Sequence, residues 1–249
     1  MYYLAIFIIG LIILYALYVF FTRPSLLSAE QQKKRFQKTD RFVILWDIHG
    51  VLFTKSILHW IYLFISYPRL LEIIWDLNRE IIVLFCKYIA AKLKLSRQEI
   101  TNQEMIEAAI RTKNDALVQL VMRISCDYKP NFATIALVKA LNTHQFTQHI
   151  GSNIGITIFE KFYTMYESIF ALFTEYFVVR IIPGKPVYKK PLPSFFTTYL
   201  EQQQRNAHDI IFIDDTVANV ATAQSLGITA LLYTTPEQLR ADLTTLGLF

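Results

Sequence analysis

Two hydrophobic patterns alternate along most of this chain. Short apolar runs rich in β-branched residues stop abruptly at a polar residue or a turn, which is typical of buried parallel strands. Between these runs, apolar residues recur at the spacing of one helix face. The runs occupy residues 41–47, 146–151, 176–182, 210–213 and 228–232, and the helical patterns follow at 132–141, 156–173, 216–227 and 236–243. The alternation predicts an α/β fold with a Rossmann-like core and a parallel sheet.

The first residues break this pattern with one long apolar run, Tyr2–Phe21, which contains no charged side chain. A run of about 20 such residues is long enough to cross a bilayer as a helix, so residues 1–22 are predicted to be a transmembrane helix. No basic segment precedes it and bulky residues end it, so cleavage as a signal peptide is not expected. Basic residues are concentrated after it, within the polar juxtamembrane linker predicted at 23–40. The positive-inside rule therefore predicts a single-pass membrane protein whose remaining domain is cytoplasmic.

Residues 54–129 interrupt the alternation of strands and helices with helical periodicity alone. A structureless connection of this length is improbable in a compact domain, so this segment is predicted to fold as a helical unit of its own. A capping box, Ser96-Arg-Gln-Glu99, marks one helix start within it. Its aromatic residues Trp60, Phe64 and Tyr67 have two interpretations, either packing within a helical bundle or lying on the bilayer or a lipidic substrate.

Composition narrows the range of functions. The chain has 249 residues, 53% of them apolar, and a formal net charge of +5. Basic residues are scattered or follow the membrane segment, so nucleic acid is not expected as a partner. The two cysteines, Cys86 and Cys126, have no metal-binding spacing and are interpreted as small core residues.

Polar residues capable of chemistry stand at the ends of the predicted strands: Asp47, Ser152, the Lys190 segment and the Asp214-Asp215 pair. Because the carboxyl ends of parallel strands meet at one edge of a sheet, these side chains are expected to gather there.

The segments around these residues resemble the four motifs of the haloacid dehalogenase-like (HAD) hydrolases. Asp47-Ile-His-Gly-Val-Leu52 resembles the first motif, D-x-D-G-[TV]-[LV], with His49 in place of the second Asp. Ser152-Asn153 resembles the second motif, and Lys190-Pro-Leu-Pro-Ser-Phe-Phe196 the third, with Lys185 and Lys189 as rivals for its lysine. The stretch from Asp214 to Gly227 reproduces the fourth, D-D-x-x-x-N-x-x-x-A-x-x-x-G. The resemblance implies a HAD-like core at 41–53 and 130–249, with 54–129 as a C1-type helical cap.

The resemblance also implies a chemistry. In this family the first Asp, here Asp47, attacks the phosphorus of a phosphorylated small molecule, and water hydrolyses the resulting aspartyl-phosphate. Mg²⁺ would be held by the Asp47 carboxylate, the backbone carbonyl of His49 and Asp215, with Asp214 binding directly or through water. The hydroxyl of Ser152, with Asn153 beside it, would bind a phosphoryl oxygen, while Lys190 would neutralise the negative charge of the nucleophile and the phosphate.

His49 occupies the position of the family's general acid and base. Imidazole can perform both proton transfers near neutral pH. Three outcomes therefore stay open: a phosphatase that uses His49, an inactive membrane-tethered binding or regulatory module, and a haloacid dehalogenase. Dehalogenases of this family also lack the second Asp, but they need no metal and have no use for the Asp214-Asp215 pair.

Overall fold

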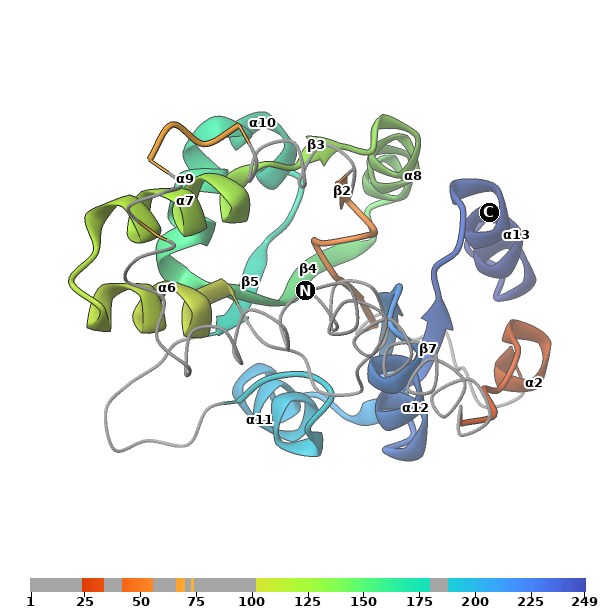
Figure 1. Ribbon diagram of the computed structural model, residues 1–249. Helices are drawn as coiled ribbons and strands as arrows, with labels where there is room; N and C mark the ends of the chain where they lie inside the picture. The colour runs from red at the N-terminus through yellow and green to blue at the C-terminus, as the bar shows by residue number, and fades with distance from the viewer. Residues whose placement is uncertain (1–23, 34–41, 56–65, 70–72, 74–101, 180–187) are drawn as a thin grey trace, which may run out of the picture.

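A five-stranded parallel sheet forms the centre of the protein (Figure 1). The computed structural model describes residues 24–33, 42–55, 66–69, 73, 102–179 and 188–249. The strand order is β5-β4-β1-β6-β7, and every neighbouring pair is parallel. The strands are β1 (Val43–Trp46), β4 (Thr147–Gly155), β5 (Glu175–Val179), β6 (Ile210–Asp214) and β7 (Thr229–Leu232). The predicted α/β fold with a parallel sheet is confirmed.

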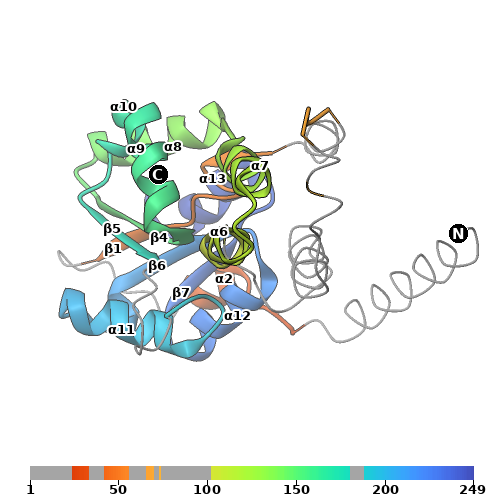
Figure 2. The ribbon, with the colours of Figure 1, turned by 60° about the vertical axis from the view of Figure 1, so that its left-hand side comes forward.

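Helices cover both faces of the sheet, as Figure 2 shows. Ile44 and Trp46 of β1 pack with one group of helices, whereas Val43 and Leu45 pack on the opposite face. The first face is covered by α8 (Phe132–Thr143), α9 (Ile156–Met165) and α13 (Pro236–Thr245), and the second by α11 (Pro193–Gln203) and α12 (Val217–Ser225). Burial on both faces explains why β1 is an unbroken apolar run rather than an alternating one.

The chain leaves and re-enters the core through two short paired strands. Strand β2 (Phe53–Thr54) is antiparallel to β3 (Lys129–Pro130), so the two ends of the predicted cap, residues 54–129, lie side by side. Within that segment the structure describes α6 (Asn102–Arg111) and α7 (Asp115–Cys126). Asn114 caps α7 by accepting a hydrogen bond from the backbone of Leu117. The C1-type cap stays a prediction, and the capping box at Ser96 lies outside the described residues.

The segment before the core is attached to the edge of the sheet. Helix α2 (Ala29–Lys33) lies beside β7, and the side-chain amide of Gln32 donates to the carbonyl of Ala230 and accepts from its backbone N–H. Gln224 hydrogen-bonds both Ala230 and the backbone of Leu27. Part of the predicted linker, residues 24–33, thus pairs with the backbone N–H and carbonyl of Ala230, which an edge strand would otherwise leave without a partner on that side.

A further prediction concerns the long apolar run at residues 2–21. In the described ranges, no helix combines the length and the apolar character needed to cross a bilayer. The transmembrane helix predicted at residues 1–22 lies outside those ranges.

The predicted strand at 146–151 extends further than expected, to Gly155. Its pairing with β5 is irregular between Ser152 and Gly155, so the strand bulges where the sequence suggested an end. The predicted helix at 156–173 is divided at Tyr166 into α9 and α10 (Glu167–Phe170). Short polar turns inside a strand are hard to distinguish from its end by sequence alone.

Candidate active site

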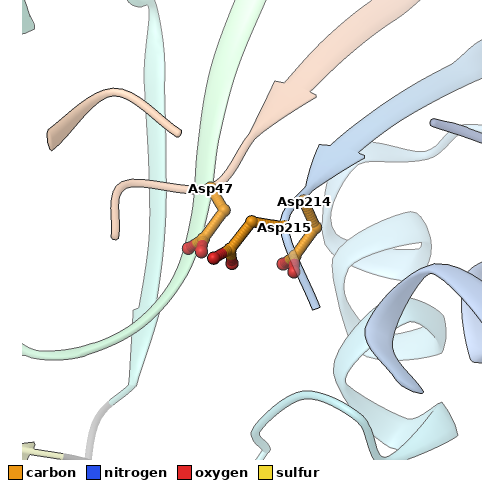
Figure 3. Close-up of side chains that lie close together, drawn as sticks. All are labelled: Asp47, Asp214 and Asp215. Atoms are coloured by element: carbon orange, nitrogen blue, oxygen red, sulfur yellow. The ribbon is translucent and has the colours of Figure 1, made fainter. Parts of the chain in front are cut away.

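Three carboxylates meet at the carboxyl ends of β1 and β6. Asp47 follows β1 directly, Asp214 ends β6, and Asp215 comes next in the chain (Figure 3). One oxygen of each lies within 4.8 Å of the others. The two strands are adjacent and in register, with Trp46 opposite Ile213, which brings Asp47 beside Asp214.

The ammonium group of Lys190 lies between two of these carboxylates. It is 2.9 Å from Oδ1 of Asp47 and 2.6 Å from Oδ2 of Asp214, and it also donates to the carbonyl of Gly151 at 2.9 Å. Its three protons match these three acceptors. The side chain is 1% exposed, so these ion pairs are shielded from water.

The rival lysines lie elsewhere. Lys189 pairs with Glu104 of α6, at 2.7 Å, and both side chains are partly exposed. Lys185 lies outside the described residues. Among the described residues, Lys190 is thus the candidate lysine whose ammonium group contacts the strand tips.

Asp214 is held by several neighbours at once. Its Oδ1 accepts from the backbone of Thr216 at 2.8 Å and from the amide of Asn219 at 3.0 Å. Its Oδ2 accepts from Lys190 and from the same amide. Because both oxygens already have donors and the side chain is fully buried, Asp214 acts here as an anchor for Lys190.

Asp215 lies against the turn that follows β1. Gly50 has a φ of 88°, a conformation that favours glycine, and a Cβ at this position would overlap the Asp215 carboxylate. The turn is closed by hydrogen bonds from Gly50 to Phe53 and from Phe53 to Ile48. The fold therefore brings the backbone at Gly50, in the first predicted motif, against the carboxylate of Asp215, in the fourth.

Negative charge is concentrated at this site. Three carboxylates lie within 4.8 Å of one another in a mostly buried place, and in the described part of the chain Lys190 forms ion pairs with two of them. Carboxylate oxygens at this spacing suit a hard divalent cation such as Mg²⁺. Asp47 and Asp215 are the better placed ligands, since each oxygen of Asp214 already accepts from two donors.

Ser152 and Asn153 lie on β4 beside this cluster in the sheet but differ in their contacts. The Ser152 hydroxyl is buried and has no hydrogen-bond partner within the part of the chain that the structure describes. The Asn153 amide instead binds the backbone of Lys190 in both directions, at 2.8 Å each. Ser152 thus keeps a hydroxyl for a ligand, while Asn153 contacts the lysine loop.

His49 packs among aromatic rings. Its ring centroid is 4.3 Å from that of Tyr128, with the planes tilted by 32°, and 6.1 Å from the edge-on ring of Phe162. Tyr128 precedes β3 and Phe162 belongs to α9, so both lie on the side of the sheet that carries α7 and α9. Tyr128 and Glu104 are contacts that sequence reasoning did not identify, because no local pattern links them to residues 49 and 189.

Comparison with known proteins identifies the fold. No protein-family model matches the chain, and no curated protein is similar to it in sequence. A predicted HAD-like hydrolase from Porphyromonas gingivalis is 18% identical over 84% of this chain and 98% of its own, with a TM-score of 0.55. The magnesium complex of a HAD family enzyme from Bacteroides thetaiotaomicron is 18% identical over 79% and 94%, with a TM-score of 0.52. L-2-haloacid dehalogenase from Xanthobacter autotrophicus, with chloropropionic acid covalently bound, is 15% identical over 82% of each chain, with a TM-score of 0.51. The chain has the HAD-like hydrolase fold.

Proposed function

We propose that this protein is a Mg²⁺-dependent hydrolase of phosphoric monoesters that acts through an aspartyl-phosphate on Asp47. One observation carries the proposal: the carboxylates of Asp47, Asp214 and Asp215 lie within 4.8 Å of one another, with Lys190 bridging two of them. Lys190, Asp47 and Asp214 come from distant parts of the sequence, and their convergence combines a nucleophile with groups that control its charge.

The metal would be held by the Asp47 carboxylate, the backbone carbonyl of His49 and Asp215, with Asp214 in a supporting position. When bound, Mg²⁺ supplies positive charge that stabilises the phosphoryl oxygens as negative charge develops on them. The tight turn at Gly50 supports this ligand set, because it keeps the His49 backbone close to Asp215.

The chain's own residues account for the remaining steps. A carboxylate oxygen of Asp47 forms a bond to phosphorus while the bond from phosphorus to the ester oxygen breaks, and the leaving oxygen takes a proton from His49. Water then attacks the phosphorus of the aspartyl-phosphate and gives a proton to His49, which releases phosphate and restores the Asp47 carboxylate. The buried Ser152 hydroxyl would donate to a phosphoryl oxygen, and Lys190 would offset the negative charge around Asp47.

The packing of His49 favours a second candidate. Its ring packs at a tilt of 32° against Tyr128 and edge-on against Phe162, and aromatic contacts of this kind are typical of a side chain that packs in a core. In that case the protein would bind a phosphorylated ligand at the same site without turning it over, as a membrane-tethered regulatory or binding module. Dehalogenation of a haloacid is less well supported, because it gives no role to Asp215.

We place this site in the cytoplasm, on a domain tethered to the bilayer by residues 1–22, with a phosphorylated small molecule as substrate and residues 54–129 as a cap over it. Labelling of engineered cysteines in intact cells tests the topology. A position such as Lys139, exposed on α8, should be protected from a membrane-impermeant reagent until the cells are opened.

Turnover of a panel of phosphate esters by the full-length chain, with Mg²⁺ and with a chelator, tests the activity. Asp47→Asn should abolish Mg²⁺-dependent turnover. His49→Asn should lower turnover of alkyl phosphates by roughly 10²–10⁴-fold, the usual contribution of general acid and base catalysis. With p-nitrophenyl phosphate, the release of phenolate in the first turnover should change little, because phenolate leaves without protonation. Steady-state turnover of the same ester should still fall, because His49 also accepts the proton of water when the aspartyl-phosphate is hydrolysed.

His49→Asp separates the two candidates. An enzyme that uses His49 should keep or increase its alkyl phosphatase activity with the family's residue restored. If the wild type is inactive on every ester while His49→Asp gains Mg²⁺-dependent turnover, the wild-type protein is a binding module. Inactivity of both proteins, with Mg²⁺ and fluoroberyllate still bound at Asp47, would also contradict the hydrolase proposal.

A further inference from the structure

Asn153 and Lys190 are joined by a reciprocal pair of hydrogen bonds. The side-chain amide of Asn153 donates to the carbonyl oxygen of Lys190, and its Oδ1 accepts from the Lys190 backbone N–H, both at 2.8 Å. Both contacts are buried. The amide therefore forms with Lys190 the same two-way pairing that one strand residue makes with its neighbour in a sheet.

We propose that Asn153 is a positioning residue, which holds the Lys190 ammonium group between Asp47 and Asp214. This inference rests on the proposed function, in which Lys190 neutralises charge at the nucleophile. It assigns Asn153 a role other than the phosphate contact expected from the sequence, because its amide is directed at the lysine backbone.

The bulge in β4 makes this contact possible. Pairing with β5 is regular up to Ser152 and resumes only at Gly155, so Asn153 lies in the irregular part of the strand. A bulge redirects a side chain that a regular strand would direct elsewhere. Here the residue after Ser152 reaches the backbone of a loop 37 positions later.

The lysine loop needs such an anchor. Lys190 stands ahead of α11, which begins at Pro193, and its neighbours Tyr188 and Leu192 are 40% and 45% exposed. Those flanking side chains contribute little burial to fix the loop. Yet the ammonium group must lie within 3 Å of carboxylates that follow two different strands. Polar contacts thus help to hold Lys190 in place, and two of them come from a single amide.

The effect of Asn153 can be measured without any catalytic activity. The full-length chain, purified in detergent, would be treated briefly with acetic anhydride, and acetylation at each lysine quantified by mass spectrometry. In the wild type, buried Lys190 should react slowly compared with Lys139, an exposed internal reference. In Asn153→Ala, loss of both hydrogen bonds should raise the Lys190 rate relative to Lys139 by roughly tenfold or more through local opening.

Gln224→Ala is the matched control. Gln224 is also a buried amide with several backbone hydrogen bonds, but it binds Leu27 and Ala230 at the β7 edge. Its loss should lower the melting temperature while leaving the Lys190 rate unchanged. An equal rise in Lys190 acetylation in both variants would show that general destabilisation explains the effect, and it would overturn the proposal. So would an unchanged rate in Asn153→Ala.

Asn153→Asp provides a second variant if the alanine protein does not fold. It keeps the acceptor for the Lys190 N–H but loses the donor to the carbonyl, so its Lys190 rate should exceed that of the wild type. A rate equal to that of the wild type would contradict the assignment.

Where turnover is found, Asn153→Ala should reduce kcat more than it changes KM, and it should have no further effect in a Lys190→Met background. If no ester is hydrolysed, the proposed function fails, while the acetylation result still decides the role of Asn153.

Discussion

The ammonium nitrogen of Lys190 lies 2.6 Å from Oδ2 of Asp214, and neither side chain has more than 1% of its surface exposed. Removing two charges from water is costly, and the cost is recovered only where each charge keeps its partners. Here Asp214 is also bound by Asn219 and Thr216, and Lys190 by Asp47 and Gly151. The pair therefore forms part of the fold as well as of the candidate site.

Lys190→Met should consequently destabilise the protein, because it leaves two buried carboxylates without their cation. We expect the free energy of unfolding to fall by about 3–5 kcal/mol, the usual cost of breaking a buried pair. Urea unfolding of the full-length chain in detergent measures this. Added Mg²⁺ should restore part of the lost stability, because it supplies positive charge to the same carboxylates.

Lys189→Met is the control for that measurement. Lys189 and Glu104 have side chains 21% and 30% exposed, and partly exposed pairs contribute no more than about 1 kcal/mol. An equal decrease in the free energy of unfolding in Lys190→Met and Lys189→Met would show that the buried and the partly exposed ion pair contribute alike, against this expectation.

Mg²⁺ should raise the melting temperature of the wild type, since a ligand that binds only the folded form stabilises it. At a Mg²⁺ concentration 100 times its dissociation constant, the free energy of unfolding rises by about 2.7 kcal/mol. Asp215→Asn should remove most of this shift. Asp242→Asn, which alters an acidic residue on α13, should retain it. A full Mg²⁺-dependent shift in Asp215→Asn would show that the proposed ligand set is wrong.

Gly50→Ala should disturb the metal site through the backbone. The added methyl group would overlap the Asp215 carboxylate, and alanine disfavours a φ of 88°. We expect weaker Mg²⁺ binding in calorimetry together with a lower melting temperature. Gly247→Ala tests strain alone, because Gly247 has a φ of 82° with open space around it. Equal Mg²⁺ affinity in the Gly50 and Gly247 variants would argue against contact between the turn and Asp215.

His149 should make stability depend on pH. Burial, with a smaller contribution from Arg205, lowers the pKa of His149 from 6.5 to about 4, and its Nδ1 is 2.8 Å from the hydroxyl of Tyr199. Between these two pKa values the unfolded chain binds more protons than the folded one, so stability rises with pH through this range. The free energy of unfolding is therefore unaffected by His149 above pH 6.5 and decreases as the pH falls towards 4. At pH 5 the decrease is about 2 kcal/mol.

His149→Gln, which can still hydrogen-bond Tyr199 but cannot be protonated, should show a smaller loss of stability between pH 7.5 and pH 5. Denaturant unfolding at both pH values measures the difference. Identical pH dependence in wild type and variant would exclude His149 as its source.

Sequence alone predicted much of the fold, for reasons that particular residues illustrate. The apolar run before Asp47 indicated a strand buried on both faces, and β1 is buried at every position. The run before Asp214 indicated its neighbour, and the polar residue after each run marked the carboxyl edge of the sheet. These predictions succeed because burial of a strand depends on consecutive residues, so its signal is local and contiguous.

Only the tertiary structure decided which residues of the candidate site contact one another. The sequence favoured Lys190 over Lys189 by its motif, whereas the ion pairs with Asp47 and Asp214 arise from chain segments that meet in space. In the same way, Asn153 binds a residue 37 positions away and Gln32 one 198 positions away. Such contacts leave no periodic trace in the sequence, because a hydrogen bond between distant segments constrains two single positions, while helix and strand formation constrain every residue along a run.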